Sequence, residues 1–399
     1  MSGPLAGVRV VELGVWVAGP ATGGILADWG ADVVKIEPPE GDPARQFLSM
    51  LGGDVPFNPP FELDNRSKRG IVVDLTKPEG YQVARDLLAR ADVFLTNIRL
   101  DALERLRLDA ATLRADAPGL VYAVLTGYGL DGPDRTRAAY DIGAFWARSG
   151  VAGLLTSPGG EPPFQRGGMG DHGAGMTLAA GVCAALVARA RSGEGQVVAT
   201  SLLRHGMYTI GFDLNTALRY GTAIGTATHA TMGNPAINCY QDADRRWFWL
   251  IGLEGDRHWP DLCRAVERPD WIDDERFATA SGRRHNVREL IPALDAIFAT
   301  RTRDEWGVAL DREGMWWAPV QTPDEVLADP QVHAGGGLVE VPDGDSTATM
   351  INSPVDFLGT PAGPRAMPPA LGQHTDEVLA ELGRDTATIA ALRASGVVA

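Results

Sequence analysis

Short runs of β-branched residues alternate with helical patterns through the first 130 residues, and this alternation constrains the fold more than any other feature. Runs of this kind that are separated by helices predict βαβ units and a parallel sheet. In such a sheet, ligands bind outside the carboxyl ends of the strands. The strands are expected at 7–13, 31–37, 70–75, 92–97 and 120–129.

The chain length and a change in residue composition along the chain predict two domains. A single hydrophobic core seldom supports 399 residues. Tryptophan and charged residues both become more frequent after about residue 225. Near the C-terminus, strand patterns followed by helical patterns return. We expect a large doubly wound α/β domain over 1–205, a linker over 206–225 and a smaller α/β domain over 226–325. Residues 326–399 are expected to return to the large domain.

Composition excludes several classes of function. A net charge of −15 and a pI near 4.9 argue against nucleic acid as a partner, because phosphate backbones need a basic face. The three scattered cysteines suit a reducing compartment. The seven histidines lack metal-binding spacing, so no metal is expected. Without a signal peptide pattern or a long apolar run, we expect a cytoplasmic protein that does not bind membranes.

Asp171 is the first candidate functional residue. It stands in the glycine-rich string GGMGDHGAG, just before an apolar helix expected over 176–191. Two interpretations are open: a helix N-cap, which the pattern alone favours, and a carboxylate nucleophile. The helix dipole would keep the group ionised, so that attack needs no general base. The glycines would allow close approach of a substrate and could offer N–H groups to an oxyanion.

Basic residues around the third and fourth predicted strands form a second candidate site. In a chain this acidic, a ligand with phosphate groups would require a local basic cluster. Lys77, Asn97 and Arg99 are expected at the carboxyl ends of strands, although solvated surface charge is the alternative. The glycine string GPATGG lacks the spacing of a dinucleotide fingerprint. The basic residues are Arg66, Lys68, Arg69, Lys77, Arg99 and Arg105.

Nine segments spread in order over nearly the whole chain are informative as a set: PLAGVRVVELG, VAGP, LADWGADVVKIEPPEGDPAR, NRSKRGIVVDLTKPEG, ADVFLTN, YDIGAFWARSG, GDHGAGMTLAAG, SGEGQVV and LGQHTDEVLAELG. Together they resemble the class III CoA-transferases, the CaiB/BaiF family of formyl-CoA transferase and carnitine CoA-transferase. The resemblance implies a Rossmann-like large domain, a smaller α/β domain and an interlocked homodimer.

The same resemblance implies a reaction and its residues. Asp171 would attack an acyl-CoA thioester, giving an acyl-aspartyl anhydride and then an aspartyl-CoA thioester, from which CoA passes to a carboxylic acid. CoA is then a cosubstrate, and no permanently bound cofactor is expected. Residues expected at CoA are Trp16, Val17, Ala18, Leu75, Lys77, Asn97, Ile98 and Arg105, with Arg99 added from its place at the sheet edge. Tyr140 and Asp141 are expected near the acyl group.

Two alternatives and a branch assignment follow from this resemblance. An α-methylacyl-CoA racemase would use a histidine where Tyr140 stands, and a phenol is the poorer base at neutral pH. A non-catalytic CoA-binding protein is the alternative outside enzymes. Val17 replaces the glutamine of formyl-CoA transferase, and its glycine-rich lid is absent, so oxalate is not expected as acceptor. AFWARSG, GDH and residues 256–260 look closer to the branch for aryl or branched 2-hydroxy acids.

Overall fold

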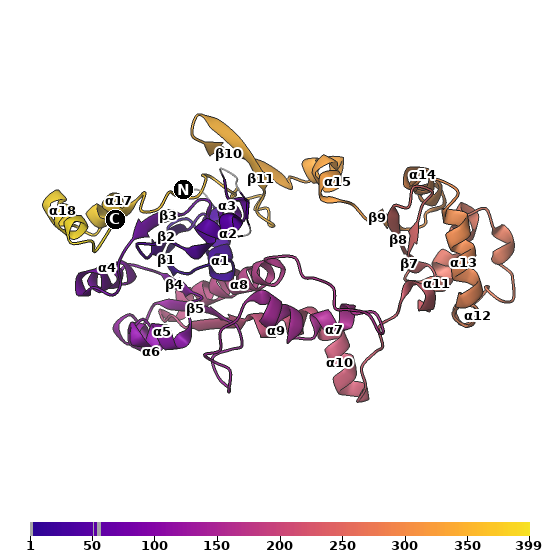
Figure 1. The fold of residues 1–399 in the computed structure, drawn as a ribbon, viewed down its shortest axis with the longest axis horizontal. Helices are drawn as coiled ribbons and strands as arrows, with labels where there is room; N and C mark the ends of the chain where they lie inside the picture. Colours follow the sequence, from indigo (N-terminus) through magenta and orange to yellow (C-terminus); the bar gives the residue numbers. More distant parts are fainter. Residues whose placement is uncertain (1–2, 51, 54–56) are drawn as a thin grey trace. The chain divides into compact units, whose positions relative to one another are not determined.

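The computed structural model describes residues 3–50, 52–53 and 57–399, and the chain forms two compact units (Figure 1). The first unit comprises Met1–Leu154, Pro163–Ala223 and His333–Ala399. The second comprises Leu155–Pro162 and Ile224–Val332. The chain therefore leaves the first unit twice, for Leu155–Pro162 and for Ile224–Val332, and its C-terminal segment His333–Ala399 belongs to the first unit again.

The first unit is built on a six-stranded sheet in which every neighbouring pair is parallel. The strand order is β3-β2-β1-β4-β5-β6, so the direction of winding reverses between β1 and β4. The parallel sheet predicted from the sequence is confirmed, with β6 added at its edge. The strands are β1 (Arg9–Leu13), β2 (Asp32–Glu37), β3 (Arg69–Val72), β4 (Val93–Thr96), β5 (Val121–Thr126) and β6 (Val197–Ser201).

Helices cover both faces of this sheet. Successive strand residues point to opposite faces and are buried in two separate hydrophobic cores, one on each face. One core contains Val10, Val33 and Leu95, and the other Val11, Val34 and Phe94. The first is covered by α1 (Ala18–Asp28) and α8 (Met169–Ser192). The second is covered by α4 (Pro78–Leu88), α5 (Leu100–Arg105), α6 (Ala110–Asp116), α17 (Thr375–Glu381) and α18 (Thr386–Ala394).

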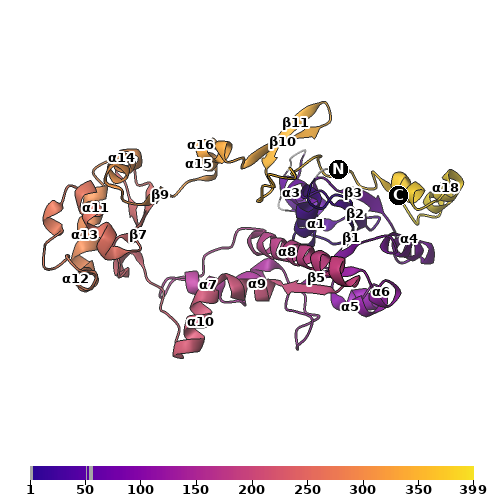
Figure 2. The same cartoon turned by 180° about the vertical axis from the view of Figure 1, so that it is seen from behind.

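The helix α8 is long and apolar enough to cross a membrane by length and composition alone. In the folded chain it packs along α1 and against β5 and β6 (Figure 2). A small residue of α8 permits this approach, because a Cβ on Gly175 would lie 3.1 Å from the carbonyl oxygen of Ala18 in α1. About a third of this apolar window, 33%, is buried in the folded chain.

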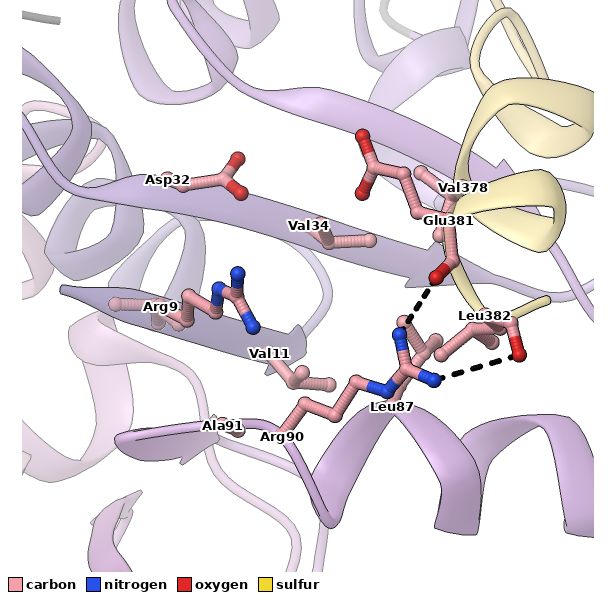
Figure 3. A pocket seen from close by; sticks show the side chains of 11 residues that line it. Arg9, Val11, Asp32, Val34, Leu87, Arg90, Ala91, Val378, Glu381 and Leu382 are labelled. Atoms are coloured by element: carbon pink, nitrogen blue, oxygen red, sulfur yellow. Dashed lines mark hydrogen bonds between the residues drawn. The ribbon is translucent and has the colours of Figure 1, made fainter. Parts of the chain in front are cut away.

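The C-terminal segment lies against the sheet of the first unit. Figure 1 shows α17 and α18 beside β3 and α4, and Figure 2 shows α18 next to α4 from the other side. Arg90 donates hydrogen bonds to the carbonyl oxygens of Glu381 and Leu382 across a cavity of about 330 Å³ (Figure 3). Arg9 and Asp32, which open β1 and β2, also line this cavity. It therefore lies at the amino ends of the strands, away from the edge where ligands are expected.

Shorter elements complete the first unit. Residues 206–225, expected as a linker, are mostly helical, because Ser201 caps α9 and the left-handed Gly221 ends α10. The elements are η1 (Pro43–Gln46), α2 (Phe47–Met50), α3 (Pro59–Asn65), a π-helical turn η2 (Ile142–Ala147), α7 (Val151–Leu155), α9 (Leu202–Thr209), α10 (Gly211–Tyr220) and the hairpin β10 (Leu338–Asp343) with β11 (Ser346–Ile351).

The second unit is a small α/β structure with its own aromatic core. Its three antiparallel strands run in the order β7 (Ile237–Gln241), β8 (Trp247–Ile251), β9 (Trp317–Pro319). Tyr240, Phe248, Trp259, Phe298 and Trp306 are buried at its centre. Its helices are η3 (His229–Thr231), α11 (Gly255–Ala265), η4 (Pro269–Trp271), α12 (Ala280–His285), α13 (Val287–Phe298), α14 (Arg303–Glu313) and α15 (Pro323–Ala328), and α16 (Pro330–Ala334) follows.

Candidate active site

A cavity of about 690 Å³ opens at the carboxyl ends of β1, β4 and β5 in the first unit. This is the point at which the strand order reverses, where open α/β sheets bind their ligands. The loops after the three strands supply most of its wall, and residues of α1, α5, η2, α8 and α9 complete it. The predicted site residues that line it are Trp16, Val17, Ala18, Asn97, Ile98, Arg99, Tyr140 and Asp171.

Asp171 lies in the first turn of α8 and is not its cap. The helix begins at Met169, and Gly168 precedes it with a left-handed φ of 75°. The expected start near residue 176 is therefore wrong, because glycines that looked like a loop form the first turns. Gly170 has no space for a side chain, since a Cβ there would lie 2.3 Å from Phe145. Close packing on that ring fixes the turn that presents Asp171 to the cavity.

The surroundings of Asp171 disfavour its charged form. Burial raises the pKa of Asp171 to about 7, and the carboxylates of Asp141 and Asp64 act in the same direction. His172 acts in the opposite direction. The expectation from the sequence considered the helix dipole, which favours the carboxylate, whereas desolvation and two neighbouring carboxylates act against it.

Asp141 does not line the cavity, and its carboxylate binds the backbone at the start of α8. Its carboxylate is buried and accepts hydrogen bonds from Gln165 Nε2 at 3.0 Å and from the backbone N–H of Gly170 at 3.3 Å. The second bond satisfies one of the free N–H groups of the first helical turn. Asp141, expected near the acyl group, therefore acts through the backbone beside Asp171. The sequence analysis did not single out Gln165.

His172 forms an ion pair with Asp64 from α3, with 3.1 Å between Nε2 and Oδ1. The hydrogen bond to Asp64 raises the pKa of His172. Asp64 stands 108 positions earlier in the chain and in no recognisable motif, so the sequence does not identify it as a site residue. Only the packing of α3 onto α1 brings it to this site.

The loop after β1 is held in a strained conformation at the cavity wall. Trp16 has a φ of 63°, a left-handed value that is uncommon for a bulky residue. Its N–H donates to Asp42 Oδ1 at 3.0 Å, and its indole meets the ring of Tyr140 edge to face at 5.7 Å. Asn97 pairs with both backbone groups of Val15, at 2.8 and 2.9 Å. The main observed contacts of Asn97 are thus to the loop that carries Trp16.

Three of the residues expected at CoA lie outside this cavity. The ammonium of Lys77 donates to the carbonyl oxygens of Ser395 and Gly396 at the end of the chain. Arg105 pairs with Asp101 on its own helix, one turn away. Leu75 packs against the core beneath α4 and α17. The C-terminal segment, which lies at the end of β3, accounts for the contacts of Lys77 alone among these three.

The basic residues before and within β3 also have partners inside the first unit. Their charges are compensated, so they do not form the phosphate-binding cluster considered from the sequence. The pairs are Arg66–Asp28, Lys68–Glu12 and Arg69–Asp32, each at 2.7 Å. Arg99 and Arg137 instead line the cavity and are exposed. Arg137, which the sequence analysis did not identify, lies 3.6 Å from Asp134.

Metal-binding geometry does not occur in the described part of the chain: across residues 3–50, 52–53 and 57–399, no three His, Cys, Asp or Glu side chains gather as ligands. The reacting group that the cavity offers is a single carboxylate. A carboxylate in a substrate-sized cavity can act as a nucleophile or as a proton carrier.

Comparisons with known proteins agree with one another. The model of CoA-transferase family III matches residues 5–375. The (R)-2-hydroxy-4-methylpentanoate CoA-transferase of Clostridioides difficile is 33% identical over 399 residues, covering 99% of each chain. The cinnamoyl-CoA:phenyllactate CoA-transferase of Clostridium sporogenes is 34% identical over 385 residues, covering 95% of this chain and 93% of that one.

The fold of the chain is also similar to that of solved structures. The crystal structure of a CaiB/BaiF family protein from Brucella suis superposes with a TM-score of 0.84 at 30% identity. The match covers 96% of this chain and 100% of that one. The chain therefore belongs to CoA-transferase family III and is a CoA-transferase.

Proposed function

We propose that the protein moves CoA from an acyl-CoA thioester to a carboxylic acid through covalent intermediates on Asp171. The observation that carries this proposal is the position of Asp171, in a close-packed helical turn on the wall of the cavity at the sheet's switch point. A carboxylate so placed can form the anhydride and thioester intermediates that divide one difficult exchange into easier steps.

The proposed steps balance without a net proton. A carboxylate oxygen of Asp171 attacks the thioester carbonyl, the C–S bond breaks, and CoA leaves as a thiolate. The thiolate attacks the Asp171 carbonyl of the mixed anhydride, releasing the donor acid and leaving an aspartyl-CoA thioester. The acceptor carboxylate then attacks that thioester, and the thiolate attacks the acceptor carbonyl of the second anhydride. The products are the acceptor's CoA thioester and free Asp171.

The cavity wall offers contacts for the two ends of the substrate. Arg99 and Arg137 provide positive charge for the phosphate groups of CoA, for which guanidinium groups are well suited. Trp16, Tyr140 and Ile142 provide an apolar wall for the acyl group. We therefore expect Arg99→Ala to raise KM for acyl-CoA with a smaller effect on kcat.

The acid substrates are proposed to be aryl or branched 2-hydroxy acids and the related enoyl acids. The aromatic and aliphatic side chains of the cavity suit such groups better than small dicarboxylates. The two transferases from the clostridia, whose names specify a branched hydroxy acid and an aryl hydroxy acid, support the same class. This assignment is tested by measuring kcat/KM for aryl and branched 2-hydroxy acids as acceptors and comparing the values with those for oxalate and succinate. Higher values for the two dicarboxylates would contradict it.

Self-association is proposed as well. Large apolar side chains on α9 and α10 are exposed in the single chain, with 85% of Tyr208, 80% of Phe212 and 80% of Leu218 accessible. Exposed apolar surface of this extent favours a protein interface. The family resemblance implies an interlocked homodimer, and light scattering during size exclusion would distinguish a dimer from a monomer.

Asp171→Ala tests the proposed chemistry. We expect CoA transfer to fall at least about 10³-fold, because no other route supplies the covalent intermediate. Asp131→Asn, which removes a carboxylate from an exposed loop, serves as control. Transfer by Asp171→Ala at the rate of the unaltered enzyme would refute the mechanism. The racemase alternative is not favoured by the comparisons, and it predicts deuterium exchange at the α-carbon without any acceptor acid.

A further inference from the structure

Three carboxylates and one histidine gather around the start of α8. Asp171 lies in α8, Asp141 is the residue that precedes η2, and Asp64 lies in α3. Both neighbouring carboxylates oppose ionisation of Asp171. Among the described residues that act on Asp171, only His172 favours its charged form. A nucleophilic carboxylate therefore depends on the charge of this imidazole.

His172 contacts two neighbouring segments, and its side chain is 44% exposed. Its Nε2 lies 3.1 Å from Oδ1 of Asp64, whose side chain is only 4% exposed. Asp64 is held by the close approach of α3 to α1, where a Cβ on Gly24 would lie 2.8 Å from the Asp64 carbonyl oxygen. The imidazole also lies over the backbone of Gly168, where a Cβ would be 3.0 Å from its Cε1. A side chain at either glycine would disturb the pair.

We propose that His172, held as an imidazolium by Asp64, is a positioning residue that keeps Asp171 in the carboxylate form needed for attack on the thioester. This inference rests on the proposed function of Asp171. His172 forms no bond with the substrate in this scheme, and its effect is electrostatic. The ion pair supplies a positive charge beside the nucleophile and at the same time compensates the charge of Asp64.

The charges that face His172 determine what each variant does. Asp64, Asp171 and Asp141 all favour its protonated form, and Lys68 lies near enough to Asp64 to interact with it. With His172 charged, the pair with Asp64 has no net charge. His172→Gln leaves the Asp64 carboxylate uncompensated beside Asp171, whereas the double variant His172→Gln/Asp64→Asn is again neutral. The single variant should therefore be the more impaired of the two.

The test measures formation of the covalent adduct on Asp171 against pH, by quenching single turnovers and quantifying the modified peptide by mass spectrometry. Loss of one adjacent opposite charge raises a carboxyl pKa by about 1 to 3 pH units, so we expect the midpoint of the His172→Gln profile to rise by at least about one unit. At a pH one unit below the original midpoint, the rate falls about tenfold, and it recovers above about pH 9.

Two variants and one control sharpen the comparison. His172→Lys, which keeps the positive charge, and the double variant should both have midpoints closer to that of the unaltered enzyme than His172→Gln does. His205→Gln changes another histidine packed on α8, against Gly173, and should leave the midpoint unchanged. Circular dichroism and thermal melting establish that each variant is folded.

The inference is overturned if folded His172→Gln keeps the original midpoint, if its rate falls equally at every pH, or if the double variant is no better than the single one. Failure of the proposed function looks different, because no adduct would then form on Asp171 in the unaltered enzyme at any pH. The amount of adduct thus tests the nucleophile, and the midpoint tests the role of His172.

Discussion

Replacing Asp171 by asparagine should stabilise the protein at neutral and alkaline pH while abolishing transfer. Burial and neighbouring carboxylates raise the pKa of Asp171 from 3.8 to about 7. Between these two values the folded state binds more protons than the unfolded state, so stability falls as pH rises through this window. Asparagine has no such dependence. The difference in free energy of unfolding between the variant and the unaltered protein should therefore be smallest below about pH 4. It should increase with pH and reach a constant maximum above about pH 8.

The magnitude follows from the same pKa difference. At about 1.36 kcal/mol per pH unit, the ionised carboxylate lowers the free energy of unfolding by at most about 4 kcal/mol. Because Asp171 is only partly buried and lines an open cavity, we expect about half of this, or ~2 kcal/mol, which corresponds to a rise in Tm of about 2–4 °C for a folding unit of this size. Melting curves from pH 4 to 9 measure it, with Asp131→Asn correcting for net charge. A Tm difference that does not change with pH would refute the reasoning.

Other substitutions test packing and contacts around the site. Arg66→Ala leaves the buried carboxylate of Asp28 unpaired and should cost about 3–5 kcal/mol, seen as a lower Tm, whereas Arg105→Ala breaks an exposed pair and should cost less than about 1 kcal/mol. Gly170→Ala drives a methyl group into a phenyl ring 2.3 Å away and should lower kcat about a hundredfold by moving the nucleophile; a rate close to the original would contradict this. Tyr140→Phe should retain transfer within about twofold and Tyr140→Ala should lose about fivefold in kcat/KM, because the edge-to-face ring contact is worth about 1 kcal/mol. An inactive Tyr140→Phe would instead indicate that the hydroxyl takes part.

The sheet could be predicted because its signal is local. Strands such as β2 and β4 are buried on both faces and appear in the sequence as continuous β-branched and apolar runs. The edge strand β6 is only partly buried and follows a long helix, so its five residues gave no comparable signal. The start of α8 was misplaced for a related reason: glycine is read as loop, while here it permits contact with Phe145.

The site could be predicted in position but not in its electrostatics. Asp171 stands in a local motif, and the loops after β1 and β4 meet at the switch point by topology alone. The pKa of Asp171 depends on Asp64 and Asp141, which reach it only through tertiary packing. Lys77 is a similar case, because the carbonyl groups that bind it lie at the far end of the chain. Local pattern cannot reveal partners of this kind.

The most direct test of the central claim follows an oxygen atom. In the proposed sequence, the acceptor carboxylate forms the second anhydride with Asp171, and the final attack on the acceptor carbonyl leaves one acceptor oxygen on the enzyme. Turnover with an acceptor acid labelled with oxygen-18 should therefore add the mass of one, and then two, isotope atoms to the peptide that contains Asp171. A peptide of unchanged mass after many turnovers would contradict the account.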